Sequence, residues 1–251
     1  LDAYPEAATF SDAEYWNVNI QNENGYFDGH LYFAVPNDFG WALVSLNQVT
    51  FFNKDLVKSK GIEPETMYQW SKNGEWTWDK LEQVAIATTD ESQGTYGLLA
   101  GENYCLMFSL IAGNGGDYIA KREVNGQMID RFVGNEEPAI EAWDFFVKLS
   151  TEHNAVLQYK GVHEINDFSS GKVAMMMTYV NRVADVSKNV NGEFEYGLIM
   201  PVKGPRATDY ISDVNWFGPL AMMANIENPE GTAQFMEEFF APAYGATSKE
   251  N

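Results

Sequence analysis

Apolar and polar residues alternate along the chain with two different periods, which together predict strands and helices in mixed order. Short runs rich in β-branched or aromatic residues, bounded by turn residues, are typical of strands. Longer segments with an apolar residue every three or four positions are typical of helices. The strand-like runs are 29–35, 43–52, 96–100, 172–178, 195–202 and 214–224. The helix-like segments are 53–60, 77–85, 103–112, 138–147, 180–187 and 228–240. This order predicts an α/β fold in which helices flank a sheet.

Two of the helix-like segments carry a well-defined apolar face. We expect Thr77 to cap the first helix and Pro138 to lie in the first turn of the second. The first face contains Trp78, Leu81, Val84 and Ala85. The second face contains Ile140, Trp143 and Val147. We expect both faces, together with Trp76, to pack in the core.

The balance of charges excludes two classes of partner. The formal net charge is −20, from 36 acidic and 16 basic residues. Such a surface repels the phosphates of nucleic acids, so we expect no nucleic-acid partner. Anionic membrane surfaces are disfavoured for the same reason. The charge suits a soluble secreted protein, but many cytosolic proteins are equally acidic, so it does not give the compartment.

Aromatic residues are abundant, which leaves two interpretations open. They make up 14% of the chain, and seven of them are tryptophans. Aromatic rings fill cores, and they also form flat stacking surfaces for the apolar faces of ligands. Composition alone does not decide between packing and ligand binding.

The sequence shows no pattern for catalysis, metals or cofactors. Its one cysteine, Cys105, excludes an intrachain disulfide and any zinc site built from paired cysteines. The three histidines, His30, His153 and His163, do not have metal-ligand spacing. The Gly171-Lys172 pair lacks the other residues of a phosphate-binding loop. We therefore expect no catalytic residue, no metal and no cofactor.

Several segments, taken in order, resemble the family of bacterial extracellular solute-binding proteins that includes maltose-binding protein. The segment most typical of that family is Phe51-Phe52-Asn53-Lys54-Asp55-Leu56. The others include Trp76-Thr77-Trp78-Asp79-Lys80-Leu81, Ala112-Gly113-Asn114-Gly115-Gly116, Phe168-Ser169-Ser170-Gly171-Lys172-Val173-Ala174-Met175 and Asn228-Pro229-Glu230-Gly231-Thr232-Ala233-Gln234-Phe235. Each segment alone is a weak pattern, but their order and spacing over residues 25–240 resemble the family throughout.

The resemblance implies a two-lobed periplasmic-binding-protein fold, of which this chain is a fragment lacking N- and C-terminal parts. By analogy, residues 1–48 and 216–251 belong to lobe one and residues 49–215 to lobe two. The chain would cross between the lobes near 43–52 and 213–216. The absence of an initiating methionine agrees with a trimmed chain, and any lipidated cysteine would lie upstream of Leu1.

The implied function is the substrate-binding component of an ABC importer, a monomer that works with a membrane permease outside the cytoplasm. A carbohydrate, in particular an oligosaccharide, would be held in a hinged cleft by aromatic rings and by polar groups that bind its hydroxyls. The candidate ligand-binding residues are Asp38, Trp41, Asn103, Tyr104, Tyr179, Asn181, Arg182, Asp213, Asn215 and Trp216. Asn181 stands where the family often has a stacking tryptophan, and Tyr179 is expected to substitute for it. A core role for Tyr104 and a plain surface loop around Asp38 and Trp41 remain open.

Two alternative functions remain open from the sequence. The first keeps the fold but binds a peptide, a polyamine or another cationic solute, which the charge of −20 would attract. The second is a carboxylate-based glycosidase, because carboxylates are too abundant for counting to exclude an acid/base pair.

Overall fold

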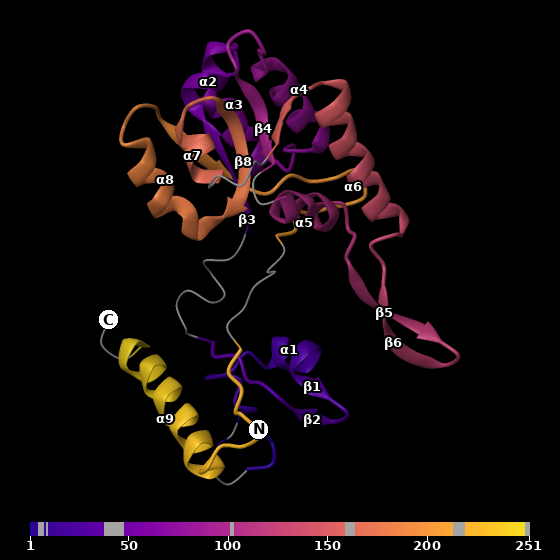
Figure 1. Cartoon of the computed structure of the whole chain (residues 1–251), viewed down its shortest axis with the longest axis vertical. Helices are drawn as coiled ribbons and strands as arrows, with labels where there is room; N and C mark the ends of the chain where they lie inside the picture. The colour runs from indigo at the N-terminus through magenta and orange to yellow at the C-terminus, as the bar shows by residue number, and fades with distance from the viewer. Residues whose placement is uncertain are drawn as a thin grey trace. The chain divides into compact units, whose positions relative to one another are not determined.

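The computed structural model describes residues 1–4, 8, 10–37, 48–100, 103–158, 164–212 and 219–248. The chain forms two compact units (Figure 1). The larger unit is Asn47–Asp213, and the smaller combines Leu1–Leu46 with Val214–Asn251. The mixture of helices and strands confirms the predicted α/β class.

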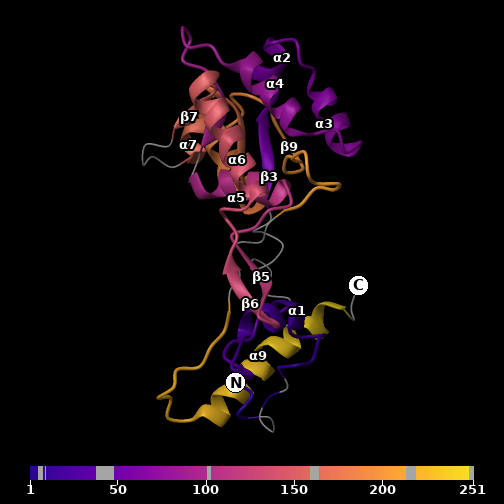
Figure 2. The same cartoon turned by 90° about the vertical axis from the view of Figure 1, so that its right-hand side faces the viewer.

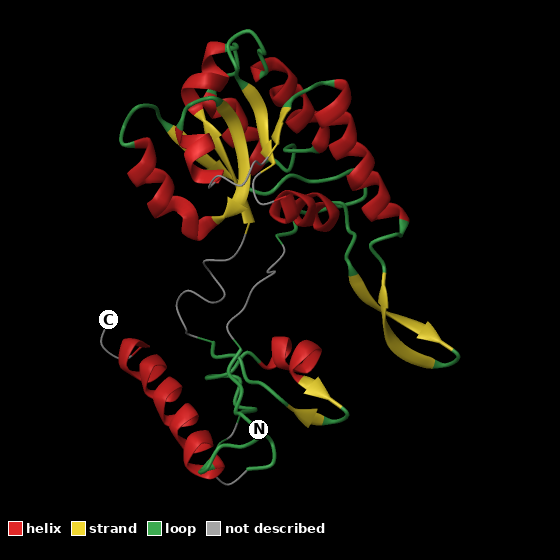
Figure 3. Cartoon of the chain, viewed as in Figure 1, coloured by secondary structure: helices red, strands yellow, loops and turns green. Residues whose placement is uncertain are grey.

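A mixed sheet of five strands forms the centre of the larger unit (Figure 3). Its strands are β3 Gln48–Asn53, β4 Tyr96–Ala100, β7 Val156–Gln158, β8 Val173–Tyr179 and β9 Tyr196–Ile199. They are ordered β7-β4-β8-β3-β9. Strand β4 is parallel to β7 and β8, whereas β3 is antiparallel to β8 and β9. The last residues of β4, β7, β8 and β9 therefore lie at the same end of the sheet as the first residue of β3. We call this the carboxyl end.

Helices cover both faces of this sheet. The helical segments are α2 Lys54–Ser59, α3 Pro64–Lys72, α4 Trp78–Thr88, α5 Asn103–Gly113, α6 Glu137–Val147, η2 Lys148–Glu152, α7 Glu164–Ser169, η3 Val180–Arg182 and α8 Val183–Val190. Side chains alternate across a strand, so neighbours such as Phe51 and Phe52 point to opposite faces. Phe51 packs in a core formed with α7 and α8, whereas Phe52 packs in the core formed with α2 to α6. Figure 1 shows α7 and α8 on one side of the sheet and α4 and α6 on the other.

Most of the predicted elements of this unit are present with boundaries shifted by a few residues. The structure has helix α2 where 53–60 was expected, and the side chain of Asn53 caps it by accepting a hydrogen bond from the Leu56 N–H, 2.9 Å away. Helix α4 begins after Thr77 and buries the predicted apolar face, and Trp76 is fully buried. The prediction for β4 matches its observed range.

The prediction of which face of α6 is buried is wrong. Ile140, Trp143 and Val147 are exposed, with Trp143 at 44%. The buried face carries Ala139, Ala142 and Phe145 instead. The small alanines allow α6 to lie close beside α5 (Figure 2), and the Phe145 ring stacks on Trp78 at a centroid distance of 4.6 Å. Since α6 is apolar on two sides, its periodicity could not show which side faces the core.

A two-stranded hairpin, β5 Ile119–Val124 and β6 Gln127–Phe132, extends away from the five-stranded sheet (Figure 1). Its turn residues Asn125 and Gly126 both have positive φ, 53° and 81°, which is the geometry of a type I′ turn. Nearly all of its side chains are exposed. This hairpin was not predicted from the sequence, although Asn-Gly between two short runs is a strong hairpin signal.

The smaller unit contains α1 Val18–Ile20, η1 Gln21–Gly25, β1 Tyr26–Phe27, β2 His30–Leu31 and α9 Pro229–Ser248. Its core surrounds Trp16, whose ring lies 5.1 Å from Phe10 and 5.9 Å from Phe240 between centroids. The indole N–H of Trp16 donates to the Glu237 carboxylate at 3.1 Å.

In the described part of the smaller unit, two of the predicted strands are present only as short pieces. The run 29–35 contains only β2 and an isolated bridge at Ala34. Of the run 214–224, the part from 219 on contains one bridge residue, Leu220, and the rest lies outside the described residues. Ala34 and Leu220 exchange two backbone hydrogen bonds of 2.9 and 2.8 Å, which join the N-terminal and C-terminal parts of the unit. In the described residues these two runs therefore pair with each other only at this bridge, and β2 pairs with β1 instead.

Candidate ligand-binding site

The carboxyl end of the five-stranded sheet is where the larger unit gathers its connecting segments. In open α/β sheets, ligands bind outside the carboxyl ends of the strands, because the loops that leave the strands there can converge on one molecule. Here the chain leaves β4, β7, β8 and β9 at this end and enters β3 at the same end.

Three of the candidate residues lie together at this end. Tyr179 is the last residue of β8, is 7% exposed, and pairs in register with Gln48 of β3. Asn181 follows in η3 and is exposed to solvent. Arg182 is partly buried, with one guanidinium nitrogen 3.8 Å from a carboxylate oxygen of Asp185. An exposed amide beside a buried phenol and a guanidinium can provide both donors and acceptors to a polar ligand.

The register also fixes where the backbone of two further candidates lies. Asn103 and Tyr104 are the first residues of α5, which begins three residues after the last residue of β4. Because β4 and β8 are parallel, α5 begins at the same carboxyl end where Tyr179 ends β8. The side chains of Asn103 and Tyr104 lie outside the described part. The remaining candidates, Asp38, Trp41, Asp213, Asn215 and Trp216, also lie outside the described residues.

Three polar residues at the carboxyl end were missed by the sequence analysis. The side chain of Gln48 is 1% exposed, and its Oε1 accepts a hydrogen bond from the Ser109 hydroxyl of α5. The backbone N–H of Gln48 donates to Ser212 Oγ at 2.9 Å, and Ser212 Oγ lies 3.3 Å from the Gln48 carbonyl, to which it can donate. Ser109 interrupts an apolar run in α5, and Gln48 precedes the apolar residues Val49, Phe51 and Phe52 of β3. These two interruptions of an apolar pattern were the available signal.

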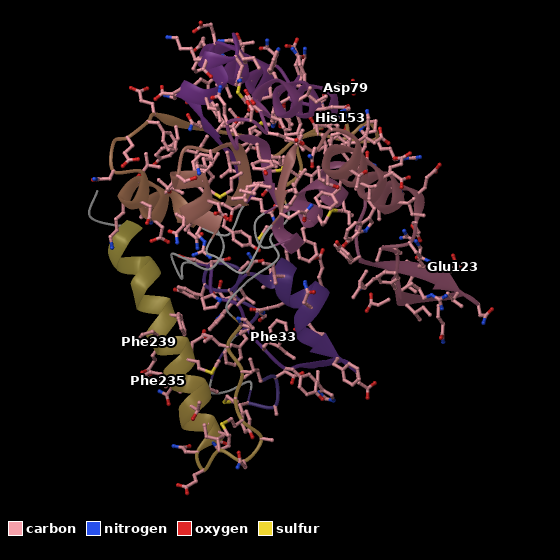
Figure 4. The ribbon with its side chains drawn as sticks, turned by 45° about the horizontal axis from the view of Figure 1, so that its top comes forward. Phe33, Asp79, Glu123, His153, Phe235 and Phe239 are labelled. Atoms are coloured by element: carbon pink, nitrogen blue, oxygen red, sulfur yellow. The ribbon has the colours of Figure 1, made fainter. Side chains whose placement is uncertain are left out.

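The larger unit also contains an ion-pair cluster on helix α4. Glu82 Oε1 accepts from Lys148 Nζ at 2.6 Å and contacts His153 Nε2 at 2.7 Å. Burial alone would raise the pKa of Glu82, but the hydrogen bonds from Lys148 and His153 outweigh burial and lower that pKa. Asp79 (labelled in Figure 4) adds negative charge beside Lys148. A carboxylate held by two basic groups joins α4 to the segment that follows α6, which is a structural role.

The described part of the chain offers no candidate metal site and no candidate membrane-spanning helix. His30 pairs with Asp2 at 3.5 Å and His153 with Glu82, while His163 lies outside the described residues. Within the described ranges no group of three His, Cys, Asp or Glu side chains could hold a metal ion. In those ranges there is also no helix both long and apolar enough to cross a membrane.

The family of the chain is established by its sequence. The sequence matches the family model for bacterial extracellular solute-binding proteins over residues 10–246. The chain therefore belongs to this family, as its sequence motifs predicted. Proteins of this family bind solutes and do not catalyse reactions, so the chain is not an enzyme and the glycosidase alternative is set aside.

Solved structures with the same fold include several binding proteins. An ABC substrate-binding protein from Listeria monocytogenes in complex with cycloalternan matches with a TM-score of 0.65 and 21% identity, covering 94% of this chain and 55% of that one. The cyclic α-maltosyl-1,6-maltose binding protein from Arthrobacter globiformis matches with a TM-score of 0.64 and 18% identity, covering 93% and 55%. UgpB from Mycobacterium tuberculosis, in complex with glycerophosphocholine, matches with a TM-score of 0.65 and 15% identity, covering 96% and 53%.

These similarities show the fold of the chain and how much of the matched structures the chain covers. At such identities the likeness concerns the fold alone, a two-lobed binding-protein fold of which this chain is a part. The chain spans about half the length of the structures it matches. No curated protein matches the sequence at a significant level.

Proposed function

We propose that this chain is the ligand-gripping part of the substrate-binding component of an ABC importer and that its solute is a carbohydrate, in particular an oligosaccharide. The proposal rests on one observation. The residues Tyr179, Asn181 and Arg182 lie together at the carboxyl end of the sheet, where α5 also begins. An aromatic residue beside neutral and charged polar groups is the combination that sugar recognition needs. Structures of the same fold hold cycloalternan and belong to a maltosyl-maltose binding protein, which supports the sugar class.

The proposal extends to the whole set of candidate ligand-binding residues. These are Asp38, Trp41, Asn103, Tyr104, Tyr179, Asn181, Arg182, Asp213, Asn215 and Trp216. Residues 1–48 and 216–251 would correspond to lobe one, and residues 49–215 to lobe two. The partner would be an ABC permease, and the protein would act as a monomer outside the cytoplasm, consistent with the description of its family as extracellular.

The proposal is tested by a thermal-shift screen of the protein against glucose, maltose, maltotriose and cycloalternan, with spermidine and a tripeptide as controls. A specific ligand at 100 times its dissociation constant adds about 2.7 kcal/mol of stability. For a protein of this size that raises the melting temperature by roughly 5 to 10 °C. A shift with sugars only supports the proposal, whereas no shift with any sugar contradicts it.

Site residues are tested with a matched pair of asparagines. Asn181→Ala removes an exposed amide at the carboxyl end and should weaken sugar binding by about 1 kcal/mol, the net worth of one hydrogen bond. Asn189→Ala removes an exposed amide on α8, whose Nδ2 donates to the Asp185 carbonyl at 2.7 Å, and should leave affinity unchanged. Isothermal titration calorimetry measures the sugar affinity of both variants. Equal affinities for the two would remove Asn181 from the site.

The sequence-derived candidate Trp216 is tested in the same way. Trp216→Ala should weaken sugar binding by about 1 kcal/mol or more if its ring stacks on the ligand. Titration with the best sugar of the screen measures the change, and unchanged affinity would remove Trp216 from the site.

A second candidate is a solute that carries a cationic group. The net charge of −20 would attract such a solute, and a structure of the same fold holds glycerophosphocholine. Added salt screens the attraction between charges but has little effect on the binding of a neutral sugar. Strong weakening of binding at high salt would therefore favour the cationic solute over the sugar.

A further inference from the structure

Gln48 occupies a special position at the carboxyl end. It is the first residue of β3, directly opposite Tyr179 of β8. Directly opposite residues of an antiparallel pair point to the same face of a sheet. The side chain of Gln48 therefore lies on the Tyr179 side of the sheet, under α5, where Ser109 contacts it.

The carboxamide of Gln48 is only partly satisfied. Its Oε1 accepts from Ser109, but its Nε2 is buried and has no hydrogen-bond partner among the described residues. The two ends of an amide group can be exchanged by a flip, and then Nε2 would face the serine and Oε1 would lack a partner. In either orientation one polar atom of a buried amide is left unpaired. An unpaired buried polar group destabilises the free protein, because it has lost its water without gaining a partner.

The main chain of Gln48 is held firmly at the same point. Both of its backbone polar groups lie within hydrogen-bond distance of the Ser212 hydroxyl, at 2.9 and 3.3 Å. The chain passes between the two compact units just before Gln48 and just after Ser212. The unpaired amide is therefore not a loose surface group, because strand pairing and Ser212 both fix its backbone.

We propose that Gln48 is a further ligand-binding residue, whose unpaired amide atom forms a hydrogen bond with a hydroxyl group of the bound sugar. The proposal rests on the proposed function and adds a specificity-determining residue to it. A sugar hydroxyl both donates and accepts, so it suits either orientation of the amide. A site built to bind a hydroxyl group discriminates against a ligand that lacks it. Contact with the neighbouring Tyr179 would hold the sugar ring of the same ligand beside Gln48.

The test compares Gln48→Met with wild type in two measurements. Methionine keeps the length and flexibility of the side chain but removes both polar atoms. Without sugar, the melting temperature should stay the same or rise, because an unpaired buried group has been removed. With the best sugar from glucose, maltose, maltotriose and cycloalternan, the dissociation constant should rise about threefold to tenfold, the effect of one lost hydrogen bond.

Thr88→Val serves as the control. Thr88 is buried at the C-terminus of α4, where its hydroxyl donates to the Val84 carbonyl at 2.8 Å. Thr88→Val should have a lower melting temperature and an unchanged sugar affinity. That result would show that lost stability alone does not weaken binding.

Three other outcomes would contradict the inference, and each points to a different cause. If wild type binds a sugar and Gln48→Met binds it equally well, a bound water or nothing at all pairs with the amide and Gln48 is not a ligand residue. If Gln48→Met melts several degrees lower or does not fold, the carboxamide is structural. If wild type binds no sugar, the proposed function itself fails and the inference fails with it.

Discussion

The five-stranded sheet of the larger unit and helix α9 of the smaller unit differ in how completely they bury their apolar residues. In the larger unit, Phe51 and Phe52 are fully buried on opposite faces of one sheet, and every residue of β8 is buried. In the smaller unit, Phe27 is 74% exposed, Phe235 61% and Phe239 55%. Figure 4 shows Phe235 and Phe239 next to each other along α9, and their ring centroids lie 5.4 Å apart.

The difference follows from the number of layers in each unit. A sheet between two layers of helices can bury both sides of its strands, so nearly continuous apolar runs such as β8 are stable there. A helix on an irregular backbone buries one stripe, and α9 does so with Ala233 and Met236. We therefore expect the larger unit to carry most of the stability of the chain and to hold its sheet end in a fixed geometry.

The largest expected effect compares two phenylalanines, one from each unit. Phe52→Ala creates a cavity beside the sheet and should lower the free energy of unfolding by about 3 to 5 kcal/mol. Phe235→Ala removes an exposed ring from α9 and should change it by less than about 0.5 kcal/mol. Urea unfolding followed by fluorescence measures both. Similar losses for the two variants would show that the Phe235 ring is buried in solution and that the contrast between the units is wrong.

A smaller effect is expected for the ion pairs that hold the loop after β9 to α6. Hydrogen bonds from Arg206 and then Asn114 lower the pKa of Glu141 to about 2, from an ordinary value of 4.5. Arg206 contacts both carboxylate oxygens of Glu141, at 2.7 and 2.8 Å. Because Glu141 is about one-third exposed, water screens the pair, and we expect Glu141→Gln to cost about 1 kcal/mol or less at neutral pH.

The pH dependence of this effect has a definite sign. A lowered pKa in the folded protein means that the carboxylate stabilises the fold above its unfolded pKa and ceases to do so as the pH falls. The difference in melting temperature between wild type and Glu141→Gln should be constant above about pH 5 and disappear between pH 4.5 and about 2. Asn73→Ala, a change at the C-cap of α3, provides a control whose difference should not follow this profile. A Glu141→Gln difference that is independent of pH would contradict the charge-based explanation.

The sequence predicted the elements of the larger unit well because its signals are local. Thr77 before an apolar stripe and Asn53 before a charged turn mark where α4 and α2 begin. The side of α6 that packs could not be predicted, because Ile140 and Phe145 lie on different apolar faces of the same helix. Only the tertiary contact of Phe145 with Trp78 decides between the two faces. In the smaller unit, single backbone bridges such as Ala34 to Leu220 leave no periodic pattern in the sequence.

The candidate site was predictable in part for the same reason. Family motifs point to segments of the chain, and Tyr179 and Asn181 follow directly from the end of the β8 segment. The partners of Gln48 are distant in sequence, since Ser109 and Ser212 are 61 and 164 residues away. No local pattern connects them, because only the antiparallel pairing of β3 with β8 places Gln48 beside Tyr179. Such a cluster therefore becomes visible only in the folded structure.

The smallest expected effect concerns the hairpin, which contrasts with the five-stranded sheet in having almost no buried side chain. Gly126→Ala places a β-carbon at a φ of +81°, which is unfavourable by about 1 kcal/mol for residues other than glycine. Since β5 and β6 pair only with each other in the described sheets, the strain should open the hairpin without reaching β8. Hydrogen exchange should show faster exchange of hairpin amides and unchanged exchange of β8 amides, with the global free energy of unfolding unchanged within about 0.5 kcal/mol. Asn125→Gly, which suits the positive φ of the same turn, should leave both regions protected. Loss of protection in β8 after Gly126→Ala would mean that the hairpin and the sheet unfold as one cooperative unit.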